Sequence, residues 1–292
     1  MKIALLIATF PETKRIAKKV AHALKAQYTE IFTEDFPDSE YHIELKKNPK
    51  NKIVVIFNSI TKNPDEKLIE TILAGGIAKD YKAKQVILMA TYFPYLRQDK
   101  HFEKYDSFSS KHIINLLGNF DKIITIDPHL HRIHSLKQLS KKAESITTNQ
   151  LVADYIKKRF KSDFTIIGPD IESTQWSAKV AKLLNKKVEI LKKTRFSATK
   201  IKQTKLKQKL SKNIIVIDDI ISTGKTIAGV LKQARQHGAK NIYCVGIHAL
   251  LTNNASKLIT KHAELITTNT IPNPYAKIDV SPLIISCLKK LL

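Results

Sequence analysis

Residues 218–226 combine side chains and spacing that suit the binding of a charged ligand. They read Asp-Asp-Ile-Ile-Ser-Thr-Gly-Lys-Thr and directly follow an apolar run at 214–217. We predict a strand that ends in two carboxylates, a short hydroxyl-bearing loop, and then a helix. A loop at a helix start directs several backbone amides to one point, and the helix dipole favours an anion there. Because carboxylates suit sugar hydroxyls or a metal, the segment predicts a pocket for a phosphorylated sugar.

The end of this segment, Ser-Thr-Gly-Lys-Thr, also resembles the end of a nucleotide-binding P-loop. That motif has a glycine five residues before its Gly-Lys pair. The corresponding residue here is Asp219, which argues against a P-loop. The remaining alternative is an ordinary strand–turn–helix connection.

The composition is that of a globular protein with room for two domains. The chain has 292 residues, of which 43% are hydrophobic. No apolar run approaches 18 residues, so we expect no membrane span, and the run at 3–10 reads as a first strand rather than a signal peptide. Cys244 and Cys287 lie in apolar segments. We expect both to be buried free thiols, which predicts a cytoplasmic location.

The positive charge is large and unevenly distributed. A formal net charge of +24 suits nucleic acid or polyanionic substrates, and a generally lysine-rich surface is the alternative. Residues 186–212 hold eleven Lys and Arg residues against one acid, Glu189. This distribution predicts a mobile basic loop beside a phosphate site. Nucleic acid is not the partner we expect, because only the net charge points to it.

Apolar strand-like runs alternate with segments of helical periodicity along the chain. The predicted strands are 3–8, 53–57, 86–90, 123–126, 165–167, 188–191, 214–217 and 243–247. The predicted helices are 14–27, 65–79, 109–117, 149–160, 176–184 and 226–237. This alternation predicts an α/β fold with largely parallel sheets flanked by helices.

A weak internal repeat supports two similar halves. Residues 141–149 read Lys-Lys-Ala-Glu-Ser-Ile-Thr-Thr-Asn, and residues 261–269 read Lys-His-Ala-Glu-Leu-Ile-Thr-Thr-Asn, an offset of 120. From the repeat and the strand pattern we predict a duplicated α/β domain, with an N-terminal domain at 1–145 and a C-terminal domain at 146–292.

Three further segments place polar side chains after predicted strands, where α/β folds bind ligands. In Asp-Pro-His-Leu-His at 127–131, His129 and His131 would share one side, although a structural zinc site would need more ligands. One histidine together with phosphate oxygens would instead complete a Mg²⁺ shell. Asp170 ends another strand, and helix capping is the alternative reading of the acids beside it. In residues 92–99, aromatics precede Arg-Gln-Asp and suit a purine, or else form a packed loop.

Taken in this order, the segments resemble ribose-phosphate pyrophosphokinases, most closely the short archaeal-type branch, over nearly the whole chain. The resemblance implies two phosphoribosyltransferase-like α/β domains, each a mostly parallel sheet flanked by helices. It also implies transfer of the diphosphoryl group of Mg-ATP to ribose 5-phosphate in the cytoplasm, with Mg²⁺ as cofactor. The N-terminal domain would be the ATP side and the C-terminal domain the ribose-5-phosphate side. The family further implies a homo-oligomer built from dimers.

The same resemblance assigns roles to individual residues of this chain. It implies that Lys193 and Arg195 are catalytic and that His129 and Asp170 are associated with Mg²⁺. The implied ATP-binding residues are Phe36, Asp38, Ser39, Glu40, Arg97, Gln98 and Asp99. The implied ribose-5-phosphate-binding residues are Arg195, Asp218, Asp219, Thr223, Gly224, Lys225 and Thr226.

Two substitutions depart from the family pattern. Ser39 and Lys225 both replace residues that are usually glycine. We expect strain at Ser39 if its φ is positive. Lys225 would add charge near the sugar phosphate. A phosphoribosyltransferase of nucleotide salvage and a non-catalytic regulatory paralogue remain the alternative functions.

Overall fold

The described chain forms two compact units. The computed structural model describes residues 4–101, 103–130, 132–191, 193–195, 201–203, 206 and 210–292. The first unit contains the chain up to Thr147 together with Thr270–Pro272 and Val280–Leu292. The second contains Thr148–Asn269 and Asn273–Asp279.

The first unit is built on a seven-stranded sheet, counted over the described residues. Its strand order is β3-β2-β1-β4-β5-β6-β7, and each pair is parallel except the β2–β3 hairpin. The strands are β1 (Leu5–Thr9), β2 (Gln27–Asp35), β3 (Tyr41–Leu45), β4 (Ile53–Ser59), β5 (Gln85–Tyr92), β6 (Lys122–Ile126) and β7 (Ala143–Ile146).

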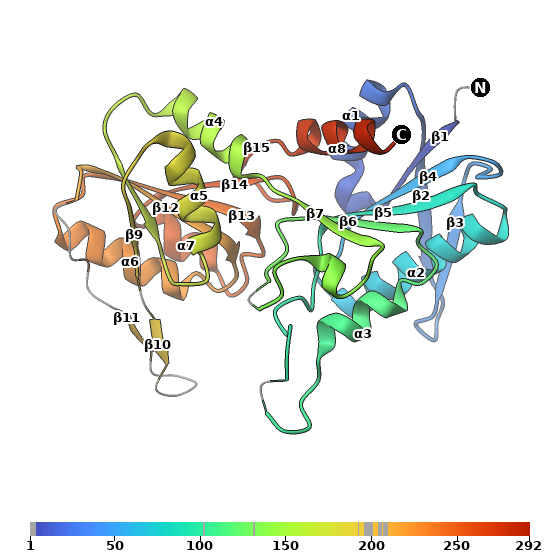
Figure 1. The fold of residues 1–292 in the computed structure, drawn as a ribbon, viewed down its shortest axis with the longest axis horizontal. Helices are drawn as coiled ribbons and strands as arrows, with labels where there is room; N and C mark the ends of the chain where they lie inside the picture. The colour runs from blue at the N-terminus through green and yellow to red at the C-terminus, as the bar shows by residue number, and fades with distance from the viewer. Residues whose placement is uncertain are drawn as a thin grey trace. The chain divides into compact units, whose positions relative to one another are not determined.

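Helices cover both faces of this sheet, which explains why its central strands β1, β4, β5 and β6 are buried almost throughout. Helices α1 (Lys14–Leu24) and α8 (Ser281–Leu291) lie side by side on one face, and α2 (Pro64–Asp80) and α3 (Ser109–Leu116) pack on the other (Figure 1). Leu6 and Ala8 belong to the core under α2, whereas Ile7 belongs to the core under α1, as strand alternation requires. Short 3-10 turns follow β1 (η1, Pro11–Thr13) and precede β7 (η2, Leu136–Gln138).

The second unit is built on a six-stranded parallel sheet in the described residues, ordered β15-β14-β13-β12-β8-β9. Helices α4 (Asn149–Arg159) and α5 (Thr174–Leu184) cover one face, and α6 (Lys225–Gln236) and α7 (Ala255–Thr260) cover the other. A separate antiparallel pair joins β10 (Lys193–Arg195) to β11 (Ile201–Gln203). The sheet strands are β8 (Thr165–Gly168), β9 (Val188–Ile190), β12 (Asn213–Ile221), β13 (Asn241–Ala249), β14 (Glu264–Thr268) and β15 (Ala276–Ile278).

The two sheets share one strand order, which confirms the expectation of two similar α/β domains with mostly parallel sheets. Taken in chain order, β1, β2, β4, β5, β6 and β7 occupy the same places as β8, β9, β12, β13, β14 and β15. The 120-residue sequence repeat does not mark equivalent strands, however. Its two copies fall on β7 and β14, whereas the strand of the second sheet that occupies the place of β7 is β15. The repeat was therefore poor support for a correct prediction.

The C-terminal end of the chain departs from the sequence boundary at 145/146. Helix α8 belongs to the first unit, because Val280, Ile284 and Leu288 pack with Ile16 and Val20 of α1 in one core. An amphipathic stripe predicts that a helix packs, but not on which sheet. No helix among the described residues is long and apolar enough to cross a membrane. Cys244 is a buried free thiol as expected, whereas Cys287 is only partly buried.

Candidate active site

The β12–α6 connection carries the residues predicted to bind ribose 5-phosphate. The sequence predicts a strand that ends at Ile217, with Asp218 and Asp219 after it. In the structure β12 continues to Ile221, so both carboxylates lie within the strand. The strand extends because Ile220 and Ile221 pair in register with β13. The loop is thereby reduced to residues 222–224, and α6 begins at Lys225.

Gly224 gives this loop its shape. It is the N-cap residue of α6 with a φ of 70°, a left-handed conformation that favours glycine. A Cβ atom at this position would lie 3.2 Å from the Cβ of Ala255 and 3.3 Å from the Cδ1 of Ile259 in α7. The turn therefore requires a glycine both for its backbone conformation and for its close approach to α7.

The start of α6 has the features of an anion site. Gly224 has no side chain that could cap the first helical amides, and the exposed Lys225 is the first helical residue. A cation in the first turn opposes the helix dipole, so this lysine is unfavourable to the helix itself. An anion held between the lysine and the helix start would reverse that penalty. Thr223 and Thr226 lie beside it and are partly exposed.

Three carboxylates interact beside this loop. Asp218 and Asp219 are only 8% and 2% exposed. Burial raises the pKa of Asp218 well above its usual range, and the negative charges of Asp219 and Asp170 raise it further. Asp170 follows β8 and is oriented by Ser173, whose backbone amide donates to Asp170 Oδ1 over 3.1 Å. Sugar hydroxyls or a cation would lower the cost of ionising this group.

The Phe36–Glu40 segment is the five-residue turn of the β2–β3 hairpin. Its ends are joined by the amide of Phe36, which donates to the carbonyl of Glu40 over 2.8 Å. Inside the turn, the Glu40 amide donates to Asp38 Oδ1 over 3.3 Å. Ser39 has a φ of 69°, so this substitution of the family's glycine carries backbone strain. The Phe36 side chain is 48% exposed and stacks on His42.

Arg97, Gln98 and Asp99 follow β5 but point to different surroundings. Arg97 and Gln98 are exposed, whereas Asp99 is 2% exposed. Asp99 Oδ2 accepts the backbone amides of Arg132 and Ile133 over 2.6 and 3.2 Å. Asp99 therefore ties this loop to the segment that follows His129, and its contact with ATP stays a prediction.

The two predicted metal residues belong to different compact units. His129 lies in the first unit after β6 and is 8% exposed, and Asp170 lies in the second. No group of three or more His, Cys, Asp or Glu residues suited to a metal ion occurs in the part of the chain that the structure describes. His131, the second histidine of its motif, lies outside the described residues.

The catalytic pair predicted in the basic segment lies on β10. The backbones of Lys193 and Arg195 pair with Gln203 and Ile201 of β11, so part of the predicted loop is a hairpin. The side chains of both residues lie outside the described part of the structure, as do residues 192, 196–200, 204–205 and 207–209 of the basic segment.

Sequence reasoning missed the residues that hold the hairpin turn and the loop after β5. The Tyr95 hydroxyl donates to Asp65, and the Tyr41 hydroxyl interacts with Glu66. Both acids lie in the first turn of α2. Acids there are usual stabilisers of a helix dipole, so the sequence carried no signal of these contacts.

Comparisons with known proteins agree with this geometry. Residues 5–120 match the family model of the N-terminal domain of ribose phosphate pyrophosphokinase, and residues 137–283 match that of the phosphoribosyl transferase domain. The chain belongs to the ribose-phosphate pyrophosphokinase family. Members of this family are enzymes that transfer a diphosphate group, and the sequence-based prediction of the family is confirmed.

Similar proteins span nearly the whole chain. The ribose-phosphate pyrophosphokinase of Methanopyrus kandleri is 28% identical over 98% of this chain and 99% of its own. That of Pyrococcus furiosus is 28% identical over 90% of this chain and 94% of its own. The crystal structure of phosphoribosylpyrophosphate synthetase from Mycobacterium smegmatis has a TM-score of 0.88 at 22% identity, covering 99% of this chain and 98% of that one. This last likeness establishes the fold.

Proposed function

We propose that this chain transfers the β,γ-diphosphoryl group of Mg-ATP to O1 of ribose 5-phosphate, yielding phosphoribosyl pyrophosphate and AMP. The observation that carries the proposal is the presence of two matched domains in one chain. Residues 137–283 match the phosphoribosyl transferase domain, which would carry the sugar-phosphate loop, and residues 5–120 match the pyrophosphokinase N-terminal domain that precedes it. We take residues 1–145 as the ATP side and residues 146–292, apart from Thr270–Pro272 and Val280–Leu292 that join the first unit, as the ribose-5-phosphate side.

Ribose 5-phosphate would bind at the β12–α6 connection. Asp218 and Asp219 would accept hydrogen bonds from the ribose hydroxyls, which suits their burial beside one another. The backbone of Thr223, Gly224 and Thr226 would hold the 5-phosphate at the helix start. Lys225 would add a direct positive charge.

ATP would bind to segments of the N-terminal domain. The exposed Phe36 ring suits packing against the adenine, while Asp38 and Glu40 provide acceptors in the same turn. Arg97 and Gln98 are exposed after β5 and suit the phosphates and the base edge. Ser39 shapes the turn, and Asp99 holds the second loop in place.

The reaction forms one bond and breaks one. O1 of the sugar attacks the β-phosphorus in line and loses its proton, while the bond from that phosphorus to the α-phosphate oxygen breaks. AMP leaves with the bridging oxygen. The protein's main contributions are positioning and neutralisation of charge. Lys193 and Arg195 would stabilise the charge that develops on the transferred group, with Arg195 also reaching the sugar substrate.

The donor set of the chain fits Mg²⁺ that is shared with the substrates. Protein-bound Mg²⁺ uses one or two carboxylates together with substrate phosphates and water. The repulsion among Asp170, Asp218 and Asp219 is an electrostatic feature that a dication would relieve. His129 and Asp170 would hold the ion directly or through water, and it would neutralise phosphate charge.

A homo-oligomer built from dimers would complete the ATP site with the hairpin turn of a neighbouring subunit. A solution mass measurement tests this: a monomeric active enzyme would contradict it.

Incubation with ATP, Mg²⁺ and ribose 5-phosphate tests the proposed reaction. The proposal predicts one AMP for each phosphoribosyl pyrophosphate formed. A salvage phosphoribosyltransferase shares the sugar-phosphate loop, and it would instead release pyrophosphate from phosphoribosyl pyrophosphate when a free base is added. A regulatory paralogue would do neither.

A further inference from the structure

Two tyrosine hydroxyls reach neighbouring carboxylates on one helical turn. The Tyr95 hydroxyl donates to Asp65 Oδ1. Tyr41 packs against the core that contains Leu68 of α2. Burial raises the pKa of its hydroxyl, and the Glu66 carboxylate, next along the chain from Asp65, lies close enough to raise that pKa further. Both acids lie in the first turn of α2, directly after the N-cap residue Asn63 and the first helical residue Pro64. One turn of helix thus contacts two segments that are more than fifty residues apart in sequence.

Each tyrosine stands at the border of a proposed ATP-binding segment. Tyr41 is the first residue of β3 and directly follows the turn that ends at Glu40. Tyr95 lies two residues before Arg97 and has a φ of 64°, an uncommon conformation for a residue with a side chain. The hydroxyl contacts therefore hold each segment close to the strand to which it is connected.

Both rings are also fixed by packing. Tyr41 and Tyr95 pack against the same buried core that includes Ile43, Leu68 and Leu96. An aromatic ring fixed in this way leaves its hydroxyl few alternative positions, so a bond to the helix orients the whole side chain. The two acids therefore do more than stabilise the helix N-terminus, because they also orient the tyrosine side chains.

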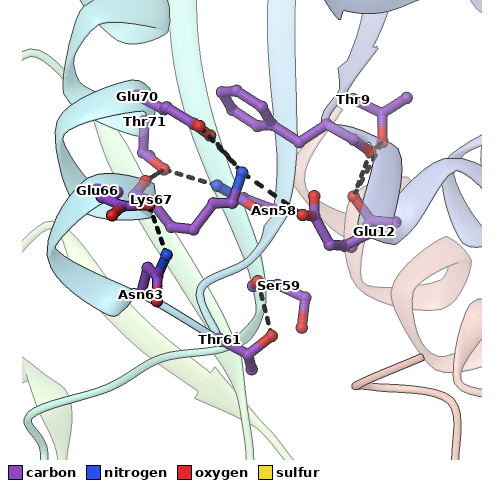
Figure 2. Close-up of polar contacts among 12 residues, drawn as sticks. Thr9, Glu12, Asn58, Ser59, Thr61, Asn63, Glu66, Lys67, Glu70 and Thr71 are labelled. Atoms are coloured by element: carbon purple, nitrogen blue, oxygen red, sulfur yellow. Dashed lines mark hydrogen bonds and ion pairs between the residues drawn. The ribbon is translucent and has the colours of Figure 1, made fainter. Parts of the chain in front are cut away.

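The helical turn itself is held from two sides (Figure 2). Asn63 Nδ2 donates to Glu66 Oε2 over 2.8 Å. Lys67 directly follows Glu66, and its Nζ lies 2.9 Å from Glu70 Oε2 and 3.5 Å from Oε1 of Glu12 in η1. The first turn of α2 is therefore braced by its N-cap residue and tied to η1, so it can serve as a fixed point for the two tyrosines.

We propose that Asp65 and Glu66 are positioning residues that hold both ATP-binding segments from one turn of α2. Asp65 sets the loop that carries Arg97 and Gln98, and Glu66 sets the hairpin turn of Phe36–Glu40. The inference rests on the proposed function, since it assumes that these segments bind ATP. It adds two acids and two tyrosines to the proposed site, and we expect them to affect the binding of ATP but not that of ribose 5-phosphate.

The test uses variants that remove only a hydroxyl group. Tyr41→Phe and Tyr95→Phe keep the ring and its packing but lose the bond to the helix. We expect each to raise the KM for ATP about 5- to 10-fold, as for the loss of one ordinary hydrogen bond, because the partly exposed carboxylates are screened by water. The KM for ribose 5-phosphate and kcat should stay within about twofold, because the reacting groups are untouched.

A matched control exists in the same sheet. The Tyr28 hydroxyl donates to Glu30 Oε1 over 3.2 Å on β2, outside both segments. Tyr28→Phe removes the same kind of bond and should leave the KM for both substrates unchanged. A rise in the KM for ATP in this variant as large as in the others would overturn the proposal, because it would reflect general loosening.

A double-mutant comparison tests the assigned partner. If Tyr95 acts through Asp65, Asp65→Asn alone and Asp65→Asn with Tyr95→Phe should raise the KM for ATP equally. Glu66→Gln should likewise match its combination with Tyr41→Phe. The inference would be overturned if the rise in the KM for ATP in a double variant equalled the product of the rises in the two single variants. An unchanged KM for ATP in the single variants would also overturn it.

A binding measurement separates this inference from the proposed function. Titration calorimetry with a non-hydrolysable ATP analogue and Mg²⁺ gives its Kd without turnover. A wild-type protein that releases no AMP but binds the analogue would refute the proposed reaction alone. Weaker analogue binding by Tyr41→Phe and Tyr95→Phe, but not by Tyr28→Phe, would then still support the positioning role. Equal binding by all variants would refute it.

Discussion

Replacement of Gly224 by alanine tests the sugar-phosphate loop most sharply. The residue has a φ of 70°, and a left-handed conformation costs a residue with a Cβ about 1–2 kcal/mol. The new Cβ would also lie 3.2 Å from Ala255 Cβ and 3.3 Å from Ile259 Cδ1, which is closer than ordinary contact. Crowding of this kind adds about 1 kcal/mol or more. We therefore expect Gly224→Ala to lower the free energy of unfolding by about 2–4 kcal/mol.

The same helix supplies a matched control. Gly238, just after α6 ends at Gln236, has a φ of 84°, and a Cβ there would meet nothing within 4 Å. Gly238→Ala therefore carries the backbone penalty of about 1–2 kcal/mol without the crowding. Urea unfolding of both variants gives the difference that is due to contact with α7.

The two variants should differ more in kcat/KM for ribose 5-phosphate than in their free energy of unfolding. Relief of the crowding would move the loop at Gly224 away from α7 and so displace its amides from the position proposed for the phosphate. We expect kcat/KM for ribose 5-phosphate to fall about 10- to 100-fold in Gly224→Ala and to stay near the wild-type value in Gly238→Ala. The assay is AMP release at saturating ATP. Equal activity in the two variants, with stability lost in both, would refute the assignment of this loop to the phosphate.

Four further changes have defined expectations. Lys225→Ala should raise the KM for ribose 5-phosphate about fivefold at low salt and less at high salt, because an exposed charge is screened; salt-titrated kinetics measure this. Lys193→Ala should lower kcat about 10²-fold or more through lost stabilisation of transition-state charge, whereas full turnover would exclude the role. Lys67→Met should destabilise the protein by about 3 kcal/mol in urea, because it leaves the buried Glu70 without its cation. Burial alone would raise the pKa of Asp121, but hydrogen bonds from Lys79 and the Val86 amide outweigh it and lower that pKa below its ordinary 3.8. The wild-type protein should therefore be more stable than Asp121→Asn by about 1 kcal/mol at neutral pH. This difference should disappear in urea unfolding as the pH falls through the lowered pKa.

The apolar periodicity of the chain was enough to predict the central strands and the main helices. Residues 53–57 and 86–90 lie within β4 and β5, and α2, α4 and α5 begin and end within two residues of prediction. These elements are buried on at least one side, so their pattern is strong. Hairpin strand β2 was missed because it is mostly exposed and rich in charged residues, and its pairing with β3 decides its conformation.

The candidate site was predicted less completely than the fold. Asp218 and Asp219 were placed after their strand because carboxylates are poor strand formers, yet pairing with β13 carries β12 past them. The burial of Asp99 and its bonds to the chain after His129 depend on contacts between distant loops. The bond between Tyr95 and Asp65 is of the same kind and has no sequence pattern. Motifs identify candidate binding residues, whereas the contacts that hold those residues in place become visible only in the packed structure.

The fate of the β-phosphorus of ATP tests the central claim most directly. Phosphorus NMR of ATP, Mg²⁺ and ribose 5-phosphate with the wild-type protein follows every phosphate at once. We predict that AMP and phosphoribosyl pyrophosphate appear together in equal amounts, and that neither forms without ribose 5-phosphate. Formation of ADP, release of free pyrophosphate in place of the sugar product, or no reaction at all would contradict the account.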